Sequence, residues 1–514
     1  MNVIITLAGE SKRFIKAGFK DDKFLLKVGD QTILEKVVNM FDANNDNFFF
    51  IISNIQNKKL IEKIINNLLK KKKIIVVKKN NLGPVQSIIS ASKLIPRDKK
   101  VIVSYCDFYV DWDYKLFQRN VDNVDANFPA FKGFHPASFG KTFYAYMKVD
   151  KNNNLLKLRE KKSFTSQRHL EPASTGIYFF KSFDLFLKYS KKLIKSKKKV
   201  NKEYYVSLLA NLMIEDGLNI KVDFVKKFIC LGTPEDYFEY NYWADYFLTN
   251  NFQLIEKENN TINLIPLGGR GKRFQEAGYK ISKPFIRLDE ETIVEKSCKS
   301  FPTAKNWIFM INKSIIKNKK NIETIKKIHK SSKTYLINDT NGQLETCFLA
   351  EKFIDKKKSI FIASCDYITI FNTKYWVKFI KTYKPDVVIW TYKLKDLKIN
   401  NYSNFAYCKI KKKNKIISIR EKTIISKNPK NDHMVVGSFW FRNFSLIKKC
   451  YKHAKKKNDR INNEYYIGNS INNLIKQGKK VLNFEIKKWI SLGDPFELNI
   501  YYYWKDHFID EYIK

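Results

Sequence analysis

The sequence predicts an α/β protein that contains two tandem copies of one domain, each with a mainly parallel sheet flanked by helices. Two observations carry this prediction. Short apolar runs alternate with segments of helical periodicity along each half, a pattern typical of doubly wound sheets. Seven blocks of the first half also return in the second half in the same order.

The repeat spans nearly the whole chain of 514 residues. The paired blocks are 7–14 with 267–274, 17–20 with 277–280, 32–36 with 292–296, 104–107 with 363–366, 159–161 with 420–422, 201–205 with 462–466, and 231–234 with 492–495. Corresponding residues are 259 to 261 positions apart throughout. We therefore expect domains at residues 1–250 and 258–514, joined by the polar stretch 249–261.

The elements of the first copy can be assigned in chain order. Residues 3–7 form a short apolar run ahead of a Gly, which indicates a buried strand followed by a loop, and residues 262–267 repeat it. The expected elements that follow are a helix at 33–40, a strand at 48–53, a helix at 60–69, a strand at 74–78, a helix at 85–94 and a strand at 101–106. Residues 145–149 and 176–180 are expected to form strands of a mixed region that covers the substrate.

Composition excludes several classes of protein. Hydrophobic residues make up 44% of the chain, enough for sizeable cores. The apolar runs stay well short of the roughly 18–20 residues of a membrane helix, and the N-terminus lacks a secretory signal pattern. Seven scattered cysteines form no CxxC pair and indicate reduced thiols. We expect a cytoplasmic protein without a membrane span.

The net charge of +45 suggests a polyanionic partner. However, 85 of the 96 basic residues are Lys and only 11 are Arg, whereas proteins that read nucleic-acid bases favour Arg. We interpret the excess as a surface-wide composition bias, so a specific nucleic-acid partner is not expected.

A Gly-rich loop follows the first strand of each copy. In the second copy it reads Gly-x-Gly-x-Arg, with Gly269, Gly271 and Arg273; in the first copy Gly9 and Arg13 correspond. Glycines let backbone N–H groups approach phosphate oxygens, and an Arg adds a fork of donors. Such a turn can equally be a structural connector. It is neither a Walker loop nor the dinucleotide fingerprint.

Two further charged positions recur at fixed spacing. Lys23 and Lys283 each lie ten residues after the loop Arg. Asp107 and Asp366 each end an apolar strand, where a carboxylate is well placed to hold Mg²⁺ against phosphates, although a turn or cap role is the plain alternative. Ligands bind off the carboxyl ends of strands in such sheets. Asp111 and Asp113 follow Asp107 as candidate acidic helpers.

A third recurring feature is a Glu-Lys pair, Glu160 with Lys161 and Glu421 with Lys422. A carboxylate can accept hydrogen bonds from sugar hydroxyls, and an adjacent amine can pair with a phosphate. An exposed charged turn is the alternative reading of either pair alone.

Together these blocks resemble the sugar-phosphate nucleotidyltransferase family, also called NTP-transferases or sugar nucleotide pyrophosphorylases, over both halves. Residues 104–108 and 133–136 are most similar to members found with capsule and surface-polysaccharide genes. The resemblance implies Rossmann-like domains of the GT-A type. It also implies transfer of a nucleotidyl group from an NTP to a sugar-1-phosphate, with release of pyrophosphate and Mg²⁺ as cofactor.

The resemblance assigns a role to each recurring residue. Arg13, Arg273, Lys23 and Lys283 would be catalytic through phosphate contacts, and Asp107 and Asp366 would hold the metal. The nucleotide-binding residues would be Gly9, Gly83, Gly269, Gly271 and Gly342. The substrate-binding residues would be Glu160, Lys161, Asn201, Glu203, Glu421, Lys422, Asn462 and Glu464. A homo-oligomer is compatible with the sequence.

The chain departs from the family pattern at several positions. Ser11 replaces the second Gly of the first loop, and Asp22 replaces the Pro before Lys23. Where many relatives place a second metal Asp, this chain has Cys230 and Ser491. Asp494 replaces the Thr of the closing Gly-Thr-Pro.

Two other functions fit parts of the sequence. One copy could be active while the other is a degenerate ligand-binding domain, although both copies keep the recurring charged residues. A GT-A glycosyltransferase would use an Asp-x-Asp metal motif, which residues 111–113 match superficially.

Overall fold

The computed structural model describes residues 1–140, 143–249, 259–397, 399 and 401–513. The chain divides into two compact units, Met1–Asp245 and Tyr246–Lys514, which are considered separately. Most of the predicted linker, 249–261, lies outside the described residues, so the boundaries at 250 and 258 stay predictions.

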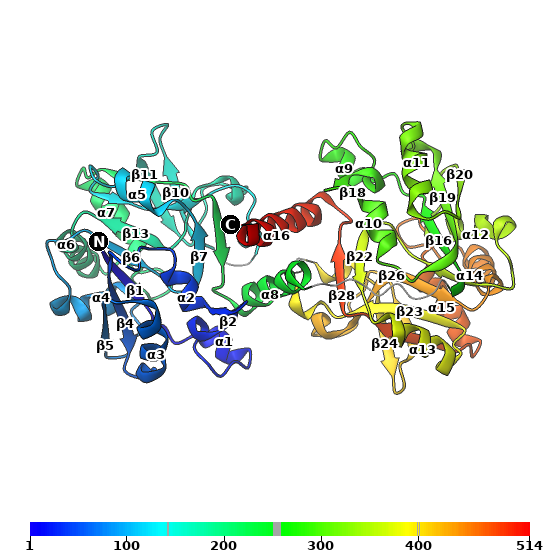
Figure 1. Ribbon diagram of the computed structural model, residues 1–514, viewed down its shortest axis with the longest axis horizontal. Coiled ribbons are helices and arrows are strands. Elements are labelled where there is room, and N and C mark those ends of the chain that lie inside the picture. Colours follow the sequence, from blue (N-terminus) through cyan, green and yellow to red (C-terminus); the bar gives the residue numbers. More distant parts are fainter. Residues whose placement is uncertain (141–142, 250–258, 398, 400, 514) are drawn as a thin grey trace. The chain divides into compact units, whose positions relative to one another are not determined.

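The first unit is organised around a seven-stranded sheet (Figure 1). Its spatial order is β14 (Ile220–Lys221), β8 (Ala126–Asn127), β13 (Ile177–Phe180), β6 (Val101–Ser104), β1 (Asn2–Thr6), β4 (Asn47–Ser53) and β5 (Lys72–Val77). Strands β6, β1, β4 and β5 run parallel, whereas β13 runs antiparallel to β6 and β8. The prediction of a mainly parallel sheet is therefore confirmed.

One expectation about this unit is wrong. Residues 176–180 were expected in the substrate-covering region, but β13 lies in the main sheet beside β6. Residues 145–149 do form β10 (Ala145–Val149) of a separate four-stranded sheet, with β11 (Leu155–Glu160), β12 (Ala173–Ser174) and β9 (Ala130–Phe131). Gly176, at φ 101°, separates β12 from β13 and lets the chain pass from one sheet to the other. The remaining short strands are β2 (Lys27–Val28), β3 (Gln31–Thr32), β7 (Phe108–Asp111) and β15 (Lys227–Cys230).

The helices of the first unit begin where the sequence offers caps. Thr32 and Glu35 form a capping box at α2 (Ile33–Val38), Asn57 caps α3 (Lys58–Leu68) and Ser182 caps α6 (Phe183–Ser196). The other helices are α1 (Lys12–Lys16), α4 (Pro84–Ala91), α5 (Tyr114–Asn120), α7 (Leu209–Glu215) and α8 (Pro234–Leu248).

The second unit repeats this plan with its sheets joined. Its nine-stranded sheet has the order β20 (Ser332–Ile337), β19 (Ala304–Asn312), β16 (Asn259–Leu267), β21 (Ser359–Ile362), β26 (His433–Phe441), β23 (Val387–Tyr392), β27 (Val481–Glu485), β25 (Lys415–Arg420) and β24 (Tyr407–Lys411). Strand β26 is long enough to pair with both β21 and β24, so this single strand corresponds to both β12 and β13 of the first unit.

The remaining elements of the second unit match those of the first. The short strands are β17 (Arg287–Leu288), β18 (Glu291–Thr292), β22 (Tyr367–Ile370) and β28 (Lys488–Ser491). The helices are α9 (Lys272–Glu276), α10 (Ile293–Lys299), α11 (Lys319–Ile328), α12 (Gln343–Phe348), α13 (Thr373–Tyr383), α14 (Phe444–Lys457), α15 (Ile467–Lys476) and α16 (Pro495–Ile513). The capping box of α2 recurs at α10, with Thr292 and Glu295.

Each unit has its own hydrophobic core. Phe180 of β13 is fully buried in the first core and pairs with Val101, and Phe441 of β26 is fully buried in the second core and pairs with Ile360. The equivalence of these pairs shows that the two sheets share one register around β6 and β21, the strands that precede the recurring Asp.

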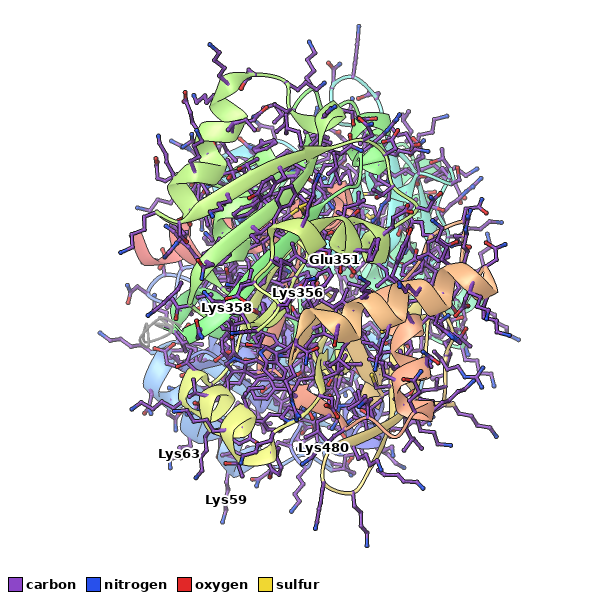
Figure 2. All side chains as sticks on the ribbon, turned by 90° about the vertical axis from the view of Figure 1, so that its right-hand side faces the viewer. Lys59, Lys63, Glu351, Lys356, Lys358 and Lys480 are labelled. Atoms are coloured by element: carbon purple, nitrogen blue, oxygen red, sulfur yellow. The ribbon has the colours of Figure 1, made fainter. Side chains whose placement is uncertain are left out.

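Figure 2 labels several of the lysine side chains. The labelled Lys59, Lys63, Lys356 and Lys480 are all exposed. The positive charge is thus carried over the surface as solvated side chains. Within the described residues, no helix is both long enough and apolar enough to span a membrane.

Candidate active site

A cavity of about 420 Å³ lies at the carboxyl ends of β1 and β6 in the first unit. Of the nine first-half residues predicted to form the site, eight line it. They are Gly9, Arg13, Lys23, Gly83, Asp107, Glu160, Lys161 and Glu203. Segments up to about 200 residues apart in sequence thus converge on one space, as the parallel topology predicts.

An ion pair lies at the base of this cavity and recurs in the second unit. Lys23 Nζ is 2.6 Å from Asp107 Oδ2, and Lys283 Nζ is 2.8 Å from Asp366 Oδ2. Burial opposes ionisation of Asp107, but Lys23 outweighs it and holds the pKa of the carboxyl below its usual value. The pKa of Lys23 is raised because Asp107 outweighs the effect of burial. Both groups are therefore charged near neutral pH.

In the first loop Ser11 stands where the second loop has a glycine, and it adopts the same left-handed backbone. Ser11 takes a left-handed conformation with φ 49°, where Gly271 has φ 67°. Its hydroxyl donates to Asp22 Oδ1 at 3.2 Å and accepts from the backbone N–H of Lys23 at 3.1 Å. Ser11 and Asp22 thus together hold the segment that carries Lys23. In the second unit, a Cβ placed on Gly271 would lie 3.3 Å from Lys283 Cβ.

Close packing explains why residues 83 and 342, at the starts of α4 and α12, are both glycines. A Cβ on Gly83 would lie 2.9 Å from Glu203 Cβ, and one on Gly342 would lie 2.8 Å from the backbone nitrogen of Tyr465. The backbone N–H of Tyr204 donates to Leu82 O at 2.7 Å, which fastens the 203–204 segment there. The segment that carries Glu203 therefore packs directly against the start of α4.

Asn201 and Asn462 occupy equivalent tight turns in the two units. Asn201 has φ 49° and the next residue, Lys202, has φ 68°, within a tight turn closed by pairing of Val200 with Glu203. Asn462 has φ 50° in the equivalent turn. Asn tolerates this conformation well, and Asn201 does not line the cavity. The structure thus gives these residues a turn-forming role.

The surroundings of the Glu-Lys pair differ between the units. In the first, Ser207 Oγ donates to Glu160 Oε2, and Lys161 Nζ lies 3.7 Å from Glu160 Oε1. In the second, burial raises the pKa of Glu421 to about 7, with Lys422 opposing the rise. Lys161 and Lys422 lie over the rings of Tyr205 and Tyr466, at 5.6 and 5.2 Å.

Sequence reasoning missed a second carboxylate near each recurring Asp. A Cβ on Gly232 would lie 3.1 Å from Asp107 Oδ2, and Asp236 in the first turn of α8 lines the same cavity. In the second unit a Cβ on Gly493 would lie 3.2 Å from Glu497 Oε2 and 3.5 Å from Asp366 Oδ2. Asp236 and Glu497 are 261 positions apart, so comparison of the repeats just past the block at 231–234 could have found them.

Asp494 pairs with the loop Arg of the second unit. Arg273 Nη1 lies 3.0 Å from Asp494 Oδ2, while Asp494 Oδ1 accepts from the backbone N–H of Glu497 at 2.9 Å. At the equivalent position of the first unit is Thr233, whose hydroxyl donates to Asp236 at 2.6 Å. The Arg273 guanidinium therefore has a carboxylate partner, whereas the residue equivalent to that carboxylate in the first unit is a threonine bonded to Asp236.

Asp111 and Asp113 are not helpers of Asp107. Asp111 pairs with Lys226 at 3.5 Å, and Asp113 Oδ1 accepts from Leu116 N at 2.8 Å as the cap of α5. Neither lines the cavity. Among the described residues, no cluster of three or more His, Cys, Asp or Glu side chains is arranged to hold a metal ion by itself.

Comparisons with known proteins agree with the repeat. A family profile described as nucleotidyl transferase matches residues 2–245 and 262–507. A solved nucleoside-diphosphate-sugar pyrophosphorylase from Vibrio cholerae RC9 is 22% identical, covering 47% of this chain and 99% of its own, with a TM-score of 0.40. HddC from Yersinia pseudotuberculosis, complexed with GMP-PN, is 19% identical over 47% of this chain and 97% of its own, with a TM-score of 0.35. A search of curated proteins finds no match.

Proposed function

Since the chain belongs to the nucleotidyl transferase family through both of its halves, we propose that each half transfers a nucleotidyl group from an NTP to a sugar-1-phosphate and releases pyrophosphate. The observation that carries this proposal is the Lys-Asp ion pair, which recurs at 2.6 and 2.8 Å at the same strand end in both units. A lone structural ion pair would not need the Gly-rich loop, the Arg and the Glu-Lys pair to recur with it.

The reaction needs charge neutralisation and positioning more than covalent chemistry. A phosphate oxygen of the acceptor attacks the α-phosphorus of the NTP, and the bond to the β-phosphate bridging oxygen breaks. Arg13 and Arg273, in the short helices α1 and α9 that follow the Gly-rich loop, would hold the outer phosphates. Lys23 and Lys283 are positioned to neutralise the α-phosphate and the incoming phosphate together. The first-unit cavity would exclude bulk water around these groups.

The residues present fit Mg²⁺ held jointly with substrate. Mg²⁺ commonly takes one or two protein carboxylates and completes its shell with phosphate oxygens and water. Asp107 and Asp366 would hold it, and the lowered pKa of Asp107 keeps that carboxylate ionised. Bound there, the ion would offset the negative charge of the phosphates.

The Glu-Lys pairs are proposed to contact the acceptor. Glu160 lines the cavity with its side chain 4% exposed, so this carboxylate is largely shielded from bulk solvent. Lys161, 33% exposed, would contact the acceptor phosphate. The likeness of residues 104–108 and 133–136 to capsule-associated members supports an activated sugar for surface polysaccharide as the product.

The test is pyrophosphate release by the full chain from a matrix of NTPs and sugar-1-phosphates with Mg²⁺. Asp107→Asn and Asp366→Asn should each abolish the activity of one half and leave that of the other. Release that needs both substrates supports the proposal. If neither substitution alters turnover or Mg²⁺ dependence with any pair, the proposed sites are wrong. If no pair gives release while nucleotide still binds, the proposed reaction is wrong.

A further inference from the structure

The two units align closely around the Glu-Lys pair. In the first, Asn211 accepts from Leu158 N at 3.0 Å and donates to Leu158 O at 2.9 Å. In the second, Asn472 makes both bonds to Ile419, each at 2.9 Å. Because Leu158 and Ile419 both lie two residues before the Glu, these bonds fix the register between the strand and the adjacent helix. Residues 207 and 468, each four positions before the Asn, are therefore structurally equivalent.

At this equivalent position the halves differ. Ser207 is fully buried and donates its hydroxyl hydrogen to Glu160. Gly468 has no side chain, and a Cβ placed on it would lie 3.1 Å from Glu421 Oε2. Within the described part of the second unit, no side chain or backbone group donates a hydrogen bond to the Glu421 carboxyl. This half-buried carboxyl is therefore left to accept a hydrogen bond from solvent or from a bound molecule.

Three further positions of the wall also differ between the units. In the first unit Tyr105, Ser174 and Tyr178 line the cavity, Ser174 Oγ donates to Tyr178 Oη at 3.0 Å, and the rings of Tyr105 and Tyr178 meet at 5.7 Å. Strand register and the spacing to Asp366 and Gly437 place Ser364, Val435 and Phe439 at these positions in the second unit. Three of the four exchanges, counting Gly468 for Ser207, reduce side-chain volume, and three remove a hydroxyl.

Resting on the proposed function, we infer that the two halves accept different sugar phosphates. The second half takes an acceptor that is larger and less polar where it meets Glu421, and that donates a hydrogen bond to this carboxylate. An N-acylamino group in place of a hydroxyl has this chemistry. Its N–H is the missing donor for Glu421, and its acyl carbon atoms occupy the volume that Tyr105 and Ser207 fill in the first half.

The raised pKa of Glu421 agrees with this arrangement. Lys161 and then Ser207 counteract the effect of burial on the pKa of Glu160, whereas only Lys422 does so for Glu421, whose pKa reaches about 7. A neutral N–H donor from the acceptor would replace the contact that Gly468 cannot make.

The experiment uses full chains in which one half is silenced, by Asp107→Asn or by Asp366→Asn. Each is assayed with matched acceptors, glucose 1-phosphate against N-acetylglucosamine 1-phosphate and galactose 1-phosphate against N-acetylgalactosamine 1-phosphate. The ratio of kcat/KM for the acetamido member over the hydroxyl member should be at least about tenfold higher when the second half is active.

Wall substitutions then test the residues. Gly468→Ser should lower the kcat/KM for the acetamido acceptor about tenfold and leave the KM for NTP unchanged, and Gly468→Ala, which adds no hydroxyl, should have the smaller effect. Ser207→Gly in the Asp366→Asn chain introduces no clash. It should raise the ratio of kcat/KM for the acetamido acceptor over that for the hydroxyl acceptor. Equal acceptor ratios in the two halves overturn the inference while pyrophosphate release upholds the proposed function. No release from any pair overturns both.

Discussion

Glu421 makes the stability of the second unit depend on pH. Its folded pKa of about 7 lies above the ordinary 4.5 because of burial. Below about pH 4.5 the group is protonated in both states and costs nothing. As pH rises from about 4.5 through 7 the unfolded chain releases this proton while the folded state retains it, so the stability present at low pH is lost.

Glu421→Gln should remove this loss. Relative to the unchanged chain, the free energy of unfolding of the variant should rise between about pH 5 and about pH 8, by at most about 3 kcal/mol. Urea unfolding at the two pH values measures it. Glu160→Gln is the matched control and should show less, since Ser207 donates to Glu160. An equal pH dependence for both variants would contradict the prediction.

The Arg273–Asp494 contact should weaken nucleotide binding by the second half. Incoming phosphates must displace a carboxylate 3.0 Å from the guanidinium, and Thr233 imposes no such cost in the first half. In the Asp107→Asn chain, Asp494→Thr should lower the KM for NTP about two- to fivefold, the range expected of an exposed ion pair. Thr233→Asp in the Asp366→Asn chain should raise it. An unchanged KM in both would show that the contact does not compete with phosphate.

At the scale of single elements, the start of α4 depends on a residue without a side chain. Gly83 has φ 92°, and a Cβ there would lie 2.9 Å from Glu203 Cβ and 3.0 Å from Tyr204 N. Gly18 has nearly the same φ, 93°, with no heavy atom within 4 Å of its Cβ position. A side chain at either glycine would strain the backbone, but only one at Gly83 would also be crowded, so comparing the two positions distinguishes the two effects.

Both Gly83→Ala and Gly18→Ala should incur the cost of a left-handed residue, about 1–3 kcal/mol. Gly83→Ala should lose at least about 1 kcal/mol more, because it overpacks the segment fastened to Leu82. It should also raise the KM for the acceptor, since Glu203 moves with that segment. Denaturant unfolding and steady-state kinetics measure both effects. Equal losses of unfolding free energy in the two variants would show that the 203–204 segment moves aside without cost.

The sequence predicted most elements because buried strands and amphipathic helices have distinct periodicities. It could not assign residues 176–180 to a sheet, because Ile177–Phe180 is apolar throughout and would suit a strand of either. The site was predicted where residue type and spacing recur together, as for Lys23 and Asp107. Asp236 and Glu497 were missed because the residue type changes and because their carboxylates come from a helix, not from the strand where the pattern places one.

At the scale of the whole chain, each unit has its own core, with Phe180 and Phe441 at equivalent, fully buried positions. Phe180→Ala and Phe441→Ala should each cost about 3–5 kcal/mol in their own unit. Calorimetry should show a different transition shifted by each variant, and activity of the unaltered half should persist at temperatures that inactivate the other. A shift of one shared transition by both would show that the units unfold together.

The tandem arrangement also has a consequence for metabolic supply. Two sites on one polypeptide are synthesised in a one-to-one ratio, whatever the level of expression. If their acceptors differ as inferred, the cell cannot adjust the balance of the two activated sugars by making more of one enzyme. That balance would follow from the concentrations of the two acceptors and from the rate constants that the two walls have acquired.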